Sequence, residues 1–238
     1  MRLSSSILAV LAGLTAAACS GNPAGSADHG GLDDCDITLN GIRFTKSLNG
    51  ASTLVKDSAG VVLFDAKPGA DFFCDPAPDT RPNTTSAVLL TEVDNTKPFT
   101  FSARVNAGFV PDGTYSAAVL FVYVDNTHWQ KLCFEQDERG NHRVVTVRTD
   151  GTSDDNNHEA FNDAGHVYFK ISSDTHKIGS YYSRDGRTWQ MARLYRNDYG
   201  DRIYLGISSQ APQVEECVST FEDLSLTDRS IENFRLGE

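Results

Sequence analysis

Residues 127–155 read THWQKLCFEQDERGNHRVVTVRTDGTSDD, and this stretch decides the fold class. From Trp129 to Gln136 the side chains divide with a period of two, which is typical of a β-strand with two different faces. Leu132 and Phe134 are expected to point into the core. The opposite face then carries Trp129, Lys131, Cys133 and Glu135. A turn at residues 138–141 separates this strand from the next, so the stretch predicts an antiparallel hairpin within an all-β fold.

The second strand of this hairpin, residues 143–149, repeats the alternation. Val145 and Val147 are expected to point inward, and Thr146 and Arg148 outward. The two strands would then share one polar face that includes an indole, an ammonium group and a carboxylate. A strand that is merely exposed to water does not need this combination. We therefore interpret this face as the candidate functional site.

After residue 36, the rest of the chain shows short strands separated by turn residues. No long segment carries the i, i+3, i+4 apolar stripe of an amphipathic helix. We therefore expect one domain, an antiparallel two-sheet β-sandwich of the jelly-roll type. Residues 115–124 are apolar on both faces, which predicts a central strand whose second face is covered by a loop or a ligand. Further strands are expected at residues 52–56, 61–65, 87–92, 99–105, 166–172, 178–183, 188–194, 202–208 and 219–226.

The composition excludes one class of partner. The chain has 238 residues, of which 39% are hydrophobic, so it can bury a full core. Its formal net charge is -11, whereas proteins that bind nucleic acid concentrate lysine and arginine. No nucleic-acid partner is expected. An acidic surface otherwise bears on solubility alone.

The N-terminus is expected to be a targeting segment. Arg2 precedes an apolar run, residues 7–14, that is too short to span a bilayer as a permanent helix. Small residues and Cys19 follow, in an arrangement that resembles the signal of bacterial lipoproteins, whose cysteine carries lipid. Lipidation of Cys19 would hold the protein at the cell envelope, and plain secretion is the alternative. The expected organisation is a signal peptide at residues 1–19, a flexible tether at 20–35, a sandwich domain at 36–228 and a C-terminal tail at 229–238.

Four cysteines follow Cys19 in the sequence. They are Cys35, Cys74, Cys133 and Cys217. In an exported protein such thiols can form disulfides, and four thiols allow three complete pairings that their spacing does not distinguish. The wide spacing lacks the close C-x-x-C pairs of structural zinc sites, so a zinc site is not expected.

The acidic pair Asp154 and Asp155 is expected in a polar loop that reaches over the edge of the sheet. Asn156 and Asn157 follow directly, and hard cations such as calcium favour carboxylate and amide oxygens as ligands. The chain lacks the D-x-[DN]-x-[DN]-G pattern of a calcium loop, and most such clusters are simply turns. The sequence therefore requires no cofactor, with calcium at this loop as the alternative.

Six short motifs occur in the same order as in a known family. They are DFFCDP at 71–76, WQKLCFE at 129–135, VVT at 144–146, SDD at 153–155, YSRDGRTW at 182–189 and GISSQAP at 206–212. With these motifs the chain resembles the regulation-of-enolase protein family, whose fold is that of concanavalin A-like lectins and glucanases. The resemblance implies a curved two-sheet sandwich with a concave face, and such faces often hold sugars in similar folds. It implies no particular reaction.

The hairpin face and this resemblance together favour a carbohydrate-binding protein of the cell envelope. An indole such as that of Trp129 stacks on sugar rings, while charged and amide side chains bind the hydroxyl groups. Two structural alternatives stay open: Trp129 caps the edge of the core, or Glu135 pairs with Arg148 across the sheet. The candidate ligand-binding residues are Trp129, Lys131, Glu135, Arg148, Asp154, Asp155 and Gln210.

Two other functions are compatible with the sequence. Glycan cleavage needs two carboxyl groups at a suitable spacing. Glu135 would supply one carboxyl group. The other would come from Asp154, Asp155 or Asp71. The third interpretation is a scaffold that binds another envelope protein, which an exposed apolar patch would favour.

Overall fold

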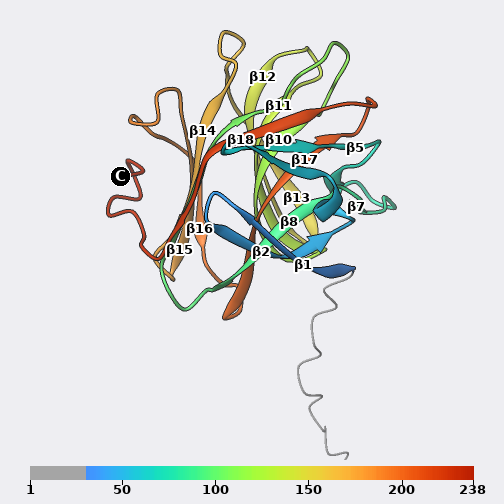
Figure 1. Ribbon diagram of the computed structural model, residues 1–238. Coiled ribbons are helices and arrows are strands. Elements are labelled where there is room, and N and C mark those ends of the chain that lie inside the picture. The colour runs from blue at the N-terminus through green and yellow to red at the C-terminus, as the bar shows by residue number, and fades with distance from the viewer. Residues whose placement is uncertain (1–30) are drawn as a thin grey trace, which may run out of the picture.

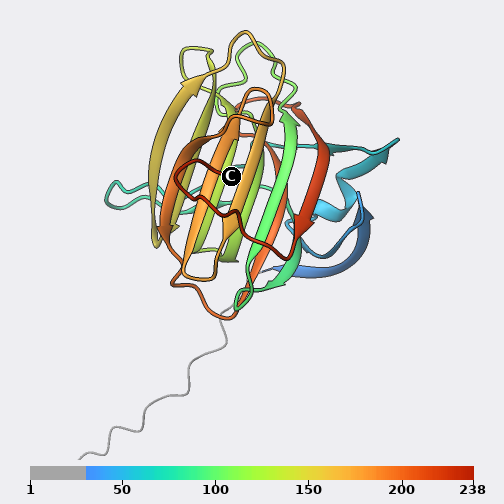
Figure 2. The same ribbon diagram turned by 90° about the vertical axis from the view of Figure 1, so that its left-hand side faces the viewer.

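Two large β-sheets pack face to face in the computed structural model, which describes residues 31–238 (Figures 1 and 2). We call the nine-stranded sheet sheet A and the seven-stranded sheet sheet B. In spatial order, sheet A contains β1 (Leu32–Leu39), β2 (Ile42–Leu48), β8 (Val88–Asp94), β17 (Arg202–Ala211), β10 (Ala117–Asp125), β11 (His128–Gln136), β12 (His142–Asp150) and β13 (Thr152–Ala160), and the short β5 (Lys67–Pro68) pairs with β17. The predicted antiparallel sandwich is confirmed, with β5 as a parallel addition.

Sheet B covers one face of sheet A. In spatial order it contains β16 (Gln190–Arg196), β15 (Lys177–Ser183), β14 (Val167–Ser173), β9 (Phe99–Asn106), β18 (Val218–Thr227), β4 (Val61–Asp65) and β3 (Val55–Ser58). A separate hairpin pairs β6 (Phe72–Phe73) with β7 (Asn83–Thr84), and η1 (Ala51–Thr53) is a short 3-10 turn. No helix within residues 31–238 is long and apolar enough to cross a membrane.

The main core lies between the two sheets and follows from strict alternation along the strands. In β9, the side chains of Phe99, Phe101, Ala103 and Val105 are buried, while the residues between them are half-exposed. Sheet A contributes its own inward row, which includes Leu132 as predicted. Burying rows of this kind from both sheets is the main stabilising contribution in a β-sandwich.

The register between β11 and β12 corrects the prediction for the second strand. Lys131 lies opposite Val147, and Cys133 lies opposite Val145. Val145 and Val147 therefore share the face of Lys131 and do not point into the core between the sheets. The prediction was wrong because VVTV places apolar residues on both faces, so alternation within this strand could not decide its orientation.

A second apolar cluster covers the other face of sheet A, which we call the outer face because it turns away from sheet B. The hairpin of β6 and β7 lies over this face and inserts the fully buried ring of Phe72. The Phe72 ring makes edge contacts with Phe121 and Trp129, at centroid distances of 5.4 and 5.1 Å. This confirms the prediction that the second face of the central strand is covered, and the covering element is this hairpin.

Both ends of the described chain contact the sandwich. β1 begins at Leu32, inside the segment expected as a tether, and pairs with β2. The C-terminal residues pack on the outside of sheet B (Figure 2), where the Tyr181 hydroxyl donates to the Phe234 carbonyl at 2.7 Å. The signal peptide, the lipidation site at Cys19 and most of the tether lie outside the described residues. The four cysteines within residues 31–238 are free thiols, and only Cys35 is not fully buried.

Candidate ligand-binding cavity

A cavity of about 410 Å³ opens on the outer face of sheet A, beside the part that Phe72 covers. Its floor consists of side chains from three adjacent strands: Lys131 and Glu135 from β11, Val145 and Val147 from β12, and Asp155 and Asn157 from β13. These residues share one face because each lies at an alternate position along its strand. The volume falls within the range of small-molecule sites.

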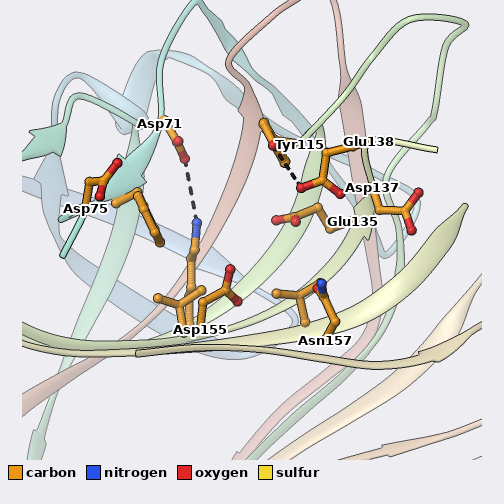
Figure 3. A pocket seen from close by; sticks show the side chains of 12 residues that line it. Asp71, Asp75, Tyr115, Glu135, Asp137, Glu138, Asp155 and Asn157 are labelled. Carbon is orange, nitrogen blue, oxygen red and sulfur yellow. Dashed lines mark hydrogen bonds and ion pairs between the residues drawn. The ribbon is translucent and has the colours of Figure 1, made fainter. Parts of the chain in front are cut away.

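The walls of the cavity come from segments that are distant in sequence. Asp71, Phe73 and Asp75 stand on one side, in and around β6. Tyr115, Asp137 and Glu138 stand on the other, next to the β11–β12 turn. Figure 3 shows Asp71 on one side and Glu135 and Glu138 on the other pointing toward a common space above the sheet. The first wall is fixed to β13, because Ser153 donates its backbone N–H to the Cys74 carbonyl at 2.8 Å.

Lys131 is the one cation among the residues that line the cavity, and it is 3% exposed. Its Nζ donates to Gln210 Oε1 at 3.1 Å and lies 3.6 Å from Asp71 Oδ1. Burial alone lowers the pKa of a lysine, but nearby acidic groups, with Asp71 contributing most, more than offset this effect. The pKa of Lys131 is therefore raised, and its ammonium group stays charged.

Glu135 differs from the other carboxyl groups of the cavity because it is 8% exposed and lacks a partner. Its carboxylate accepts no hydrogen bond and forms no ion pair with any other residue of the described chain. Burial raises the pKa of Glu135 to about 8, and the charge of Lys131 only partly opposes the rise. At neutral pH this side chain is therefore mostly a neutral acid that can donate a proton.

The buried Glu135 makes stability depend on pH. The folded protein keeps the Glu135 proton up to a pH of about 8, whereas the unfolded chain loses it near 4.5. Between these values the folded state binds more protons, so the free energy of unfolding should fall as the pH rises, by roughly 1.4 kcal/mol for each pH unit. Glu135→Gln should remove this slope in urea unfolding measured from pH 5 to pH 9.

A matched variant controls for this experiment. Asp154→Asn makes the same kind of change in an exposed carboxylate outside the cavity, and it should leave the slope intact. An unchanged slope in Glu135→Gln would contradict the raised pKa.

Trp129 does not line the cavity. Its side chain is fully buried, it packs against Phe72 and Phe121, and its Nε1 donates to the Asn126 carbonyl at 3.3 Å. The prediction that Trp129 stacks on a ligand is therefore wrong. Alternation correctly placed the indole on the outer face, but it gave no information on the hairpin that covers it.

Among the other predicted site residues, Lys131, Glu135 and Asp155 line the cavity, whereas Arg148, Asp154 and Gln210 do not. Arg148 lies on the inner face, with its guanidinium over the Tyr195 ring at 4.8 Å, so it cannot pair with Glu135. Asp154 pairs with Arg193 at 3.3 Å. Gln210 is fully buried behind the cavity, where it positions Lys131.

The acidic pair occupies a strand and not the predicted loop. Asp154 and Asp155 are neighbours in β13, so their side chains point to opposite faces of sheet A. A strand as polar as TSDDNNHEA is tolerated because β13 is the edge of the sheet. Within residues 31–238, no group of three His, Cys, Asp or Glu side chains is arranged to hold a metal ion.

Sequence reasoning missed several residues that line the cavity. Phe73 and Asp75 belong to the DFFCDP motif, which could have indicated a second segment at the site. Tyr115 donates its hydroxyl to Glu138 Oε1 at 3.0 Å (Figure 3), and both residues lie in turns. No local pattern connects these positions, because only the folded topology brings them together.

Comparisons with known proteins agree with this architecture. The family described as "Protein of unknown function (DUF1349)" matches residues 48–229. The chain belongs to this family. Regulation of enolase protein 1 of Saccharomyces cerevisiae is 25% identical over 135 residues, which cover 57% of this chain and 67% of that protein. The resemblance to the regulation-of-enolase family is therefore confirmed.

Solved structures show a similar fold. A functionally unknown protein from Saccharomyces cerevisiae aligns with a TM-score of 0.68 and 24% identity over 76% of this chain and 95% of that chain. The GH43 protein BlXynB from Bacillus licheniformis aligns with a TM-score of 0.57 and 17% identity, over 87% of this chain but 40% of that one. The β-sandwich is thus an architecture that also occurs in glycan-active proteins.

Proposed function

We propose that this protein binds a carbohydrate in the cavity on the outer face of sheet A. The observation that carries the proposal is the combination of the half-buried Phe73 ring with the polar groups of Lys131, Glu135 and Asp155 around one hollow. Sugars need both features, an apolar surface for the face of the ring and polar groups for its hydroxyls. Phe73 takes the role that the sequence suggested for Trp129.

The fold supports this proposal more weakly. The xylan beta-1,4-xylosidase from Bacillus halodurans shares the fold with a TM-score of 0.53 and 12% identity, over 87% of this chain and 40% of that enzyme. Fold alone does not determine function, so the argument depends on the cavity. A scaffold function would be favoured by an exposed apolar patch. Within residues 31–238 only two large hydrophobic side chains, Val218 and Leu236, are exposed, so this function lacks support.

Phe73→Ala tests the proposal. A glycan-array screen of the wild-type chain comes first, and calorimetry then measures the affinity for the best glycan. Loss of the ring face should weaken binding about fivefold or more, since aromatic contacts contribute on the order of 1 kcal/mol or more. Phe109→Ala removes a ring that is also half-buried but packs on His142 between the sheets, and it should leave the affinity unchanged. Binding to no glycan, or equal affinity in Phe73→Ala, would refute the proposal.

Glycan cleavage is a second candidate, and the buried Glu135 in the cavity is the observation that favours it. A carboxylic acid that keeps its proton at neutral pH suits the role of general acid. Asp154 cannot be its partner because it lies outside the cavity, and Asp71 already pairs with Lys131. Asp155 is the remaining carboxylate of those predicted. Release of new reducing ends that stops in Glu135→Gln would support cleavage, and turnover that persists in this variant would exclude Glu135.

We also propose that the protein acts at the cell envelope through lipid on Cys19, with a short tether before the sandwich. The support is the sequence of residues 1–19 alone. Mass spectrometry of the native protein should find a diacylglyceryl group on Cys19. A mature N-terminus beyond Cys19 would mean free secretion instead.

A further inference from the structure

The cavity is strongly acidic. Six carboxyl groups line it, from Asp71, Asp75, Glu135, Asp137, Glu138 and Asp155, and Lys131 is the single cation among the lining residues. The Lys131 charge is already balanced by Asp71, and Asp137 is paired with Arg143 at 2.7 Å. Glu138 accepts only a hydrogen bond from Tyr115, and Asp155 has no cation as an ion-pair partner within the described chain. Both of these carboxylates, Glu138 and Asp155, are exposed to solvent.

A second observation concerns Glu135 within this acidic cluster. Glu135 is more than nine-tenths buried, points into the cavity (Figure 3) and has no hydrogen-bond or ion-pair partner within residues 31–238. Its carboxyl oxygens are not among the fully enclosed polar atoms that lack a partner, so they face the hollow of the cavity. A ligand group that donates hydrogen bonds would bind to this carboxyl group. Glu138 and Asp155, which line the same cavity, would add negative charge around such a group.

From these contacts we infer that the cavity selects glycans carrying a free ammonium group, that is, deacetylated amino sugars, over neutral glycans and uronates. This inference rests on the proposed carbohydrate function and names the class of ligand. An ammonium group donates three hydrogen bonds and carries the charge that the lining lacks. The carboxylate of a uronate would enter an already negative, partly desolvated site and be repelled.

Calorimetry with four tetrasaccharide probes tests this selectivity at pH 6 and low salt. The probes are the tetramers of glucosamine, N-acetylglucosamine, glucose and galacturonate. We expect the glucosamine tetramer to bind about tenfold more tightly than the glucose tetramer, and the galacturonate tetramer not to bind. The advantage of glucosamine should shrink as salt is added, because screening weakens charge interactions.

Two adjacent substitutions separate the cavity from the general charge of the protein. Asp155→Asn should reduce the glucosamine preference severalfold, whereas Asp154→Asn should leave it unchanged. Both variants remove one exposed carboxylate from β13, but only Asp155 lines the cavity. An equal effect of the two variants would overturn the inference, since a general charge effect would then explain the binding.

Other outcomes are also decisive. Equal or tighter binding of the glucose, N-acetylglucosamine or galacturonate tetramer would overturn the amino-sugar inference and leave carbohydrate binding in place. Spermidine that binds as tightly as the glucosamine tetramer would show that the cavity recognises cations and not sugars. Absence of binding by all four tetramers, together with a negative glycan array, would end both the inference and the proposed function.

Discussion

Phe72→Ala should lower the free energy of unfolding by about 3 to 5 kcal/mol, the usual cost of deleting a fully buried phenylalanine ring. Phe72 is the residue through which the β6–β7 hairpin covers sheet A, and its ring contacts Phe121, Tyr123 and Trp129. Its removal leaves a cavity and loosens the hairpin. Urea unfolding at pH 7 measures the loss.

Trp129 provides a local readout of the same event. The chain has two tryptophans, so in a Trp189→Phe background the fluorescence reports Trp129 alone. Phe72→Ala should shift its emission to the red, because water reaches the indole. Phe73→Ala is the matched control: this neighbouring ring is only half-buried, so its loss should destabilise less and leave the emission unchanged. Equal effects of the two substitutions would show that Phe72 is not the anchor of the hairpin.

Lys131→Met should also be destabilising, by about 3 kcal/mol at pH 7, because it removes a buried ammonium group and leaves the half-buried carboxylate of Asp71 uncompensated. Methionine keeps the length of the side chain but removes the charge that faces Asp71 and Gln210. In this variant the pKa of Glu135 should rise further, because the ammonium of Lys131 holds it down in the wild-type protein. Urea unfolding and a carboxyl titration by NMR measure the two effects.

Lys97→Met is the control for burial. The Lys97 ammonium lies closer to its carboxylate, 3.0 Å from Asp94 Oδ2, but both side chains are exposed. Exposed ion pairs contribute little to stability, so this substitution should leave the unfolding free energy almost unchanged. If Lys131→Met also left the free energy of unfolding unchanged, the buried ammonium would not stabilise the fold around the cavity.

The fold could be predicted because its strands carry their own pattern. β9 and β11 alternate clearly enough to fix both faces, and the turn between β11 and β12 has Gly140 at a positive φ of 76°. β13 could not be predicted from its residues, since it has no apolar row and is held by pairing to β12. The pairing of β1 with β2 was not predicted either. Both strands precede residues 52–56, where the first strand was predicted.

The candidate site could be predicted only in part, because one strand shows which residues share a face but not what lies above them. Lys131 and Glu135, which were predicted to share a face, both line the cavity. Trp129 shares their face, yet its ring is covered by Phe72, which lies 57 positions earlier in the chain (129 minus 72). No local pattern indicates this contact. The orientation of β12 depended on its register with β11, which apolar residues at 144, 145 and 147 left undecided.

Methyl NMR of valine-labelled protein tests the central claim, that a glycan occupies the cavity. Val145 and Val147 line the cavity floor, whereas Val105 and Val167 are buried between the sheets. Titration with the glycan that binds best should shift the Val145 and Val147 methyl signals saturably and leave the other two in place. Shifts that spare Val145 and Val147 and fall instead on the exposed Val218 would contradict the account, because the ligand would then bind elsewhere on the sandwich.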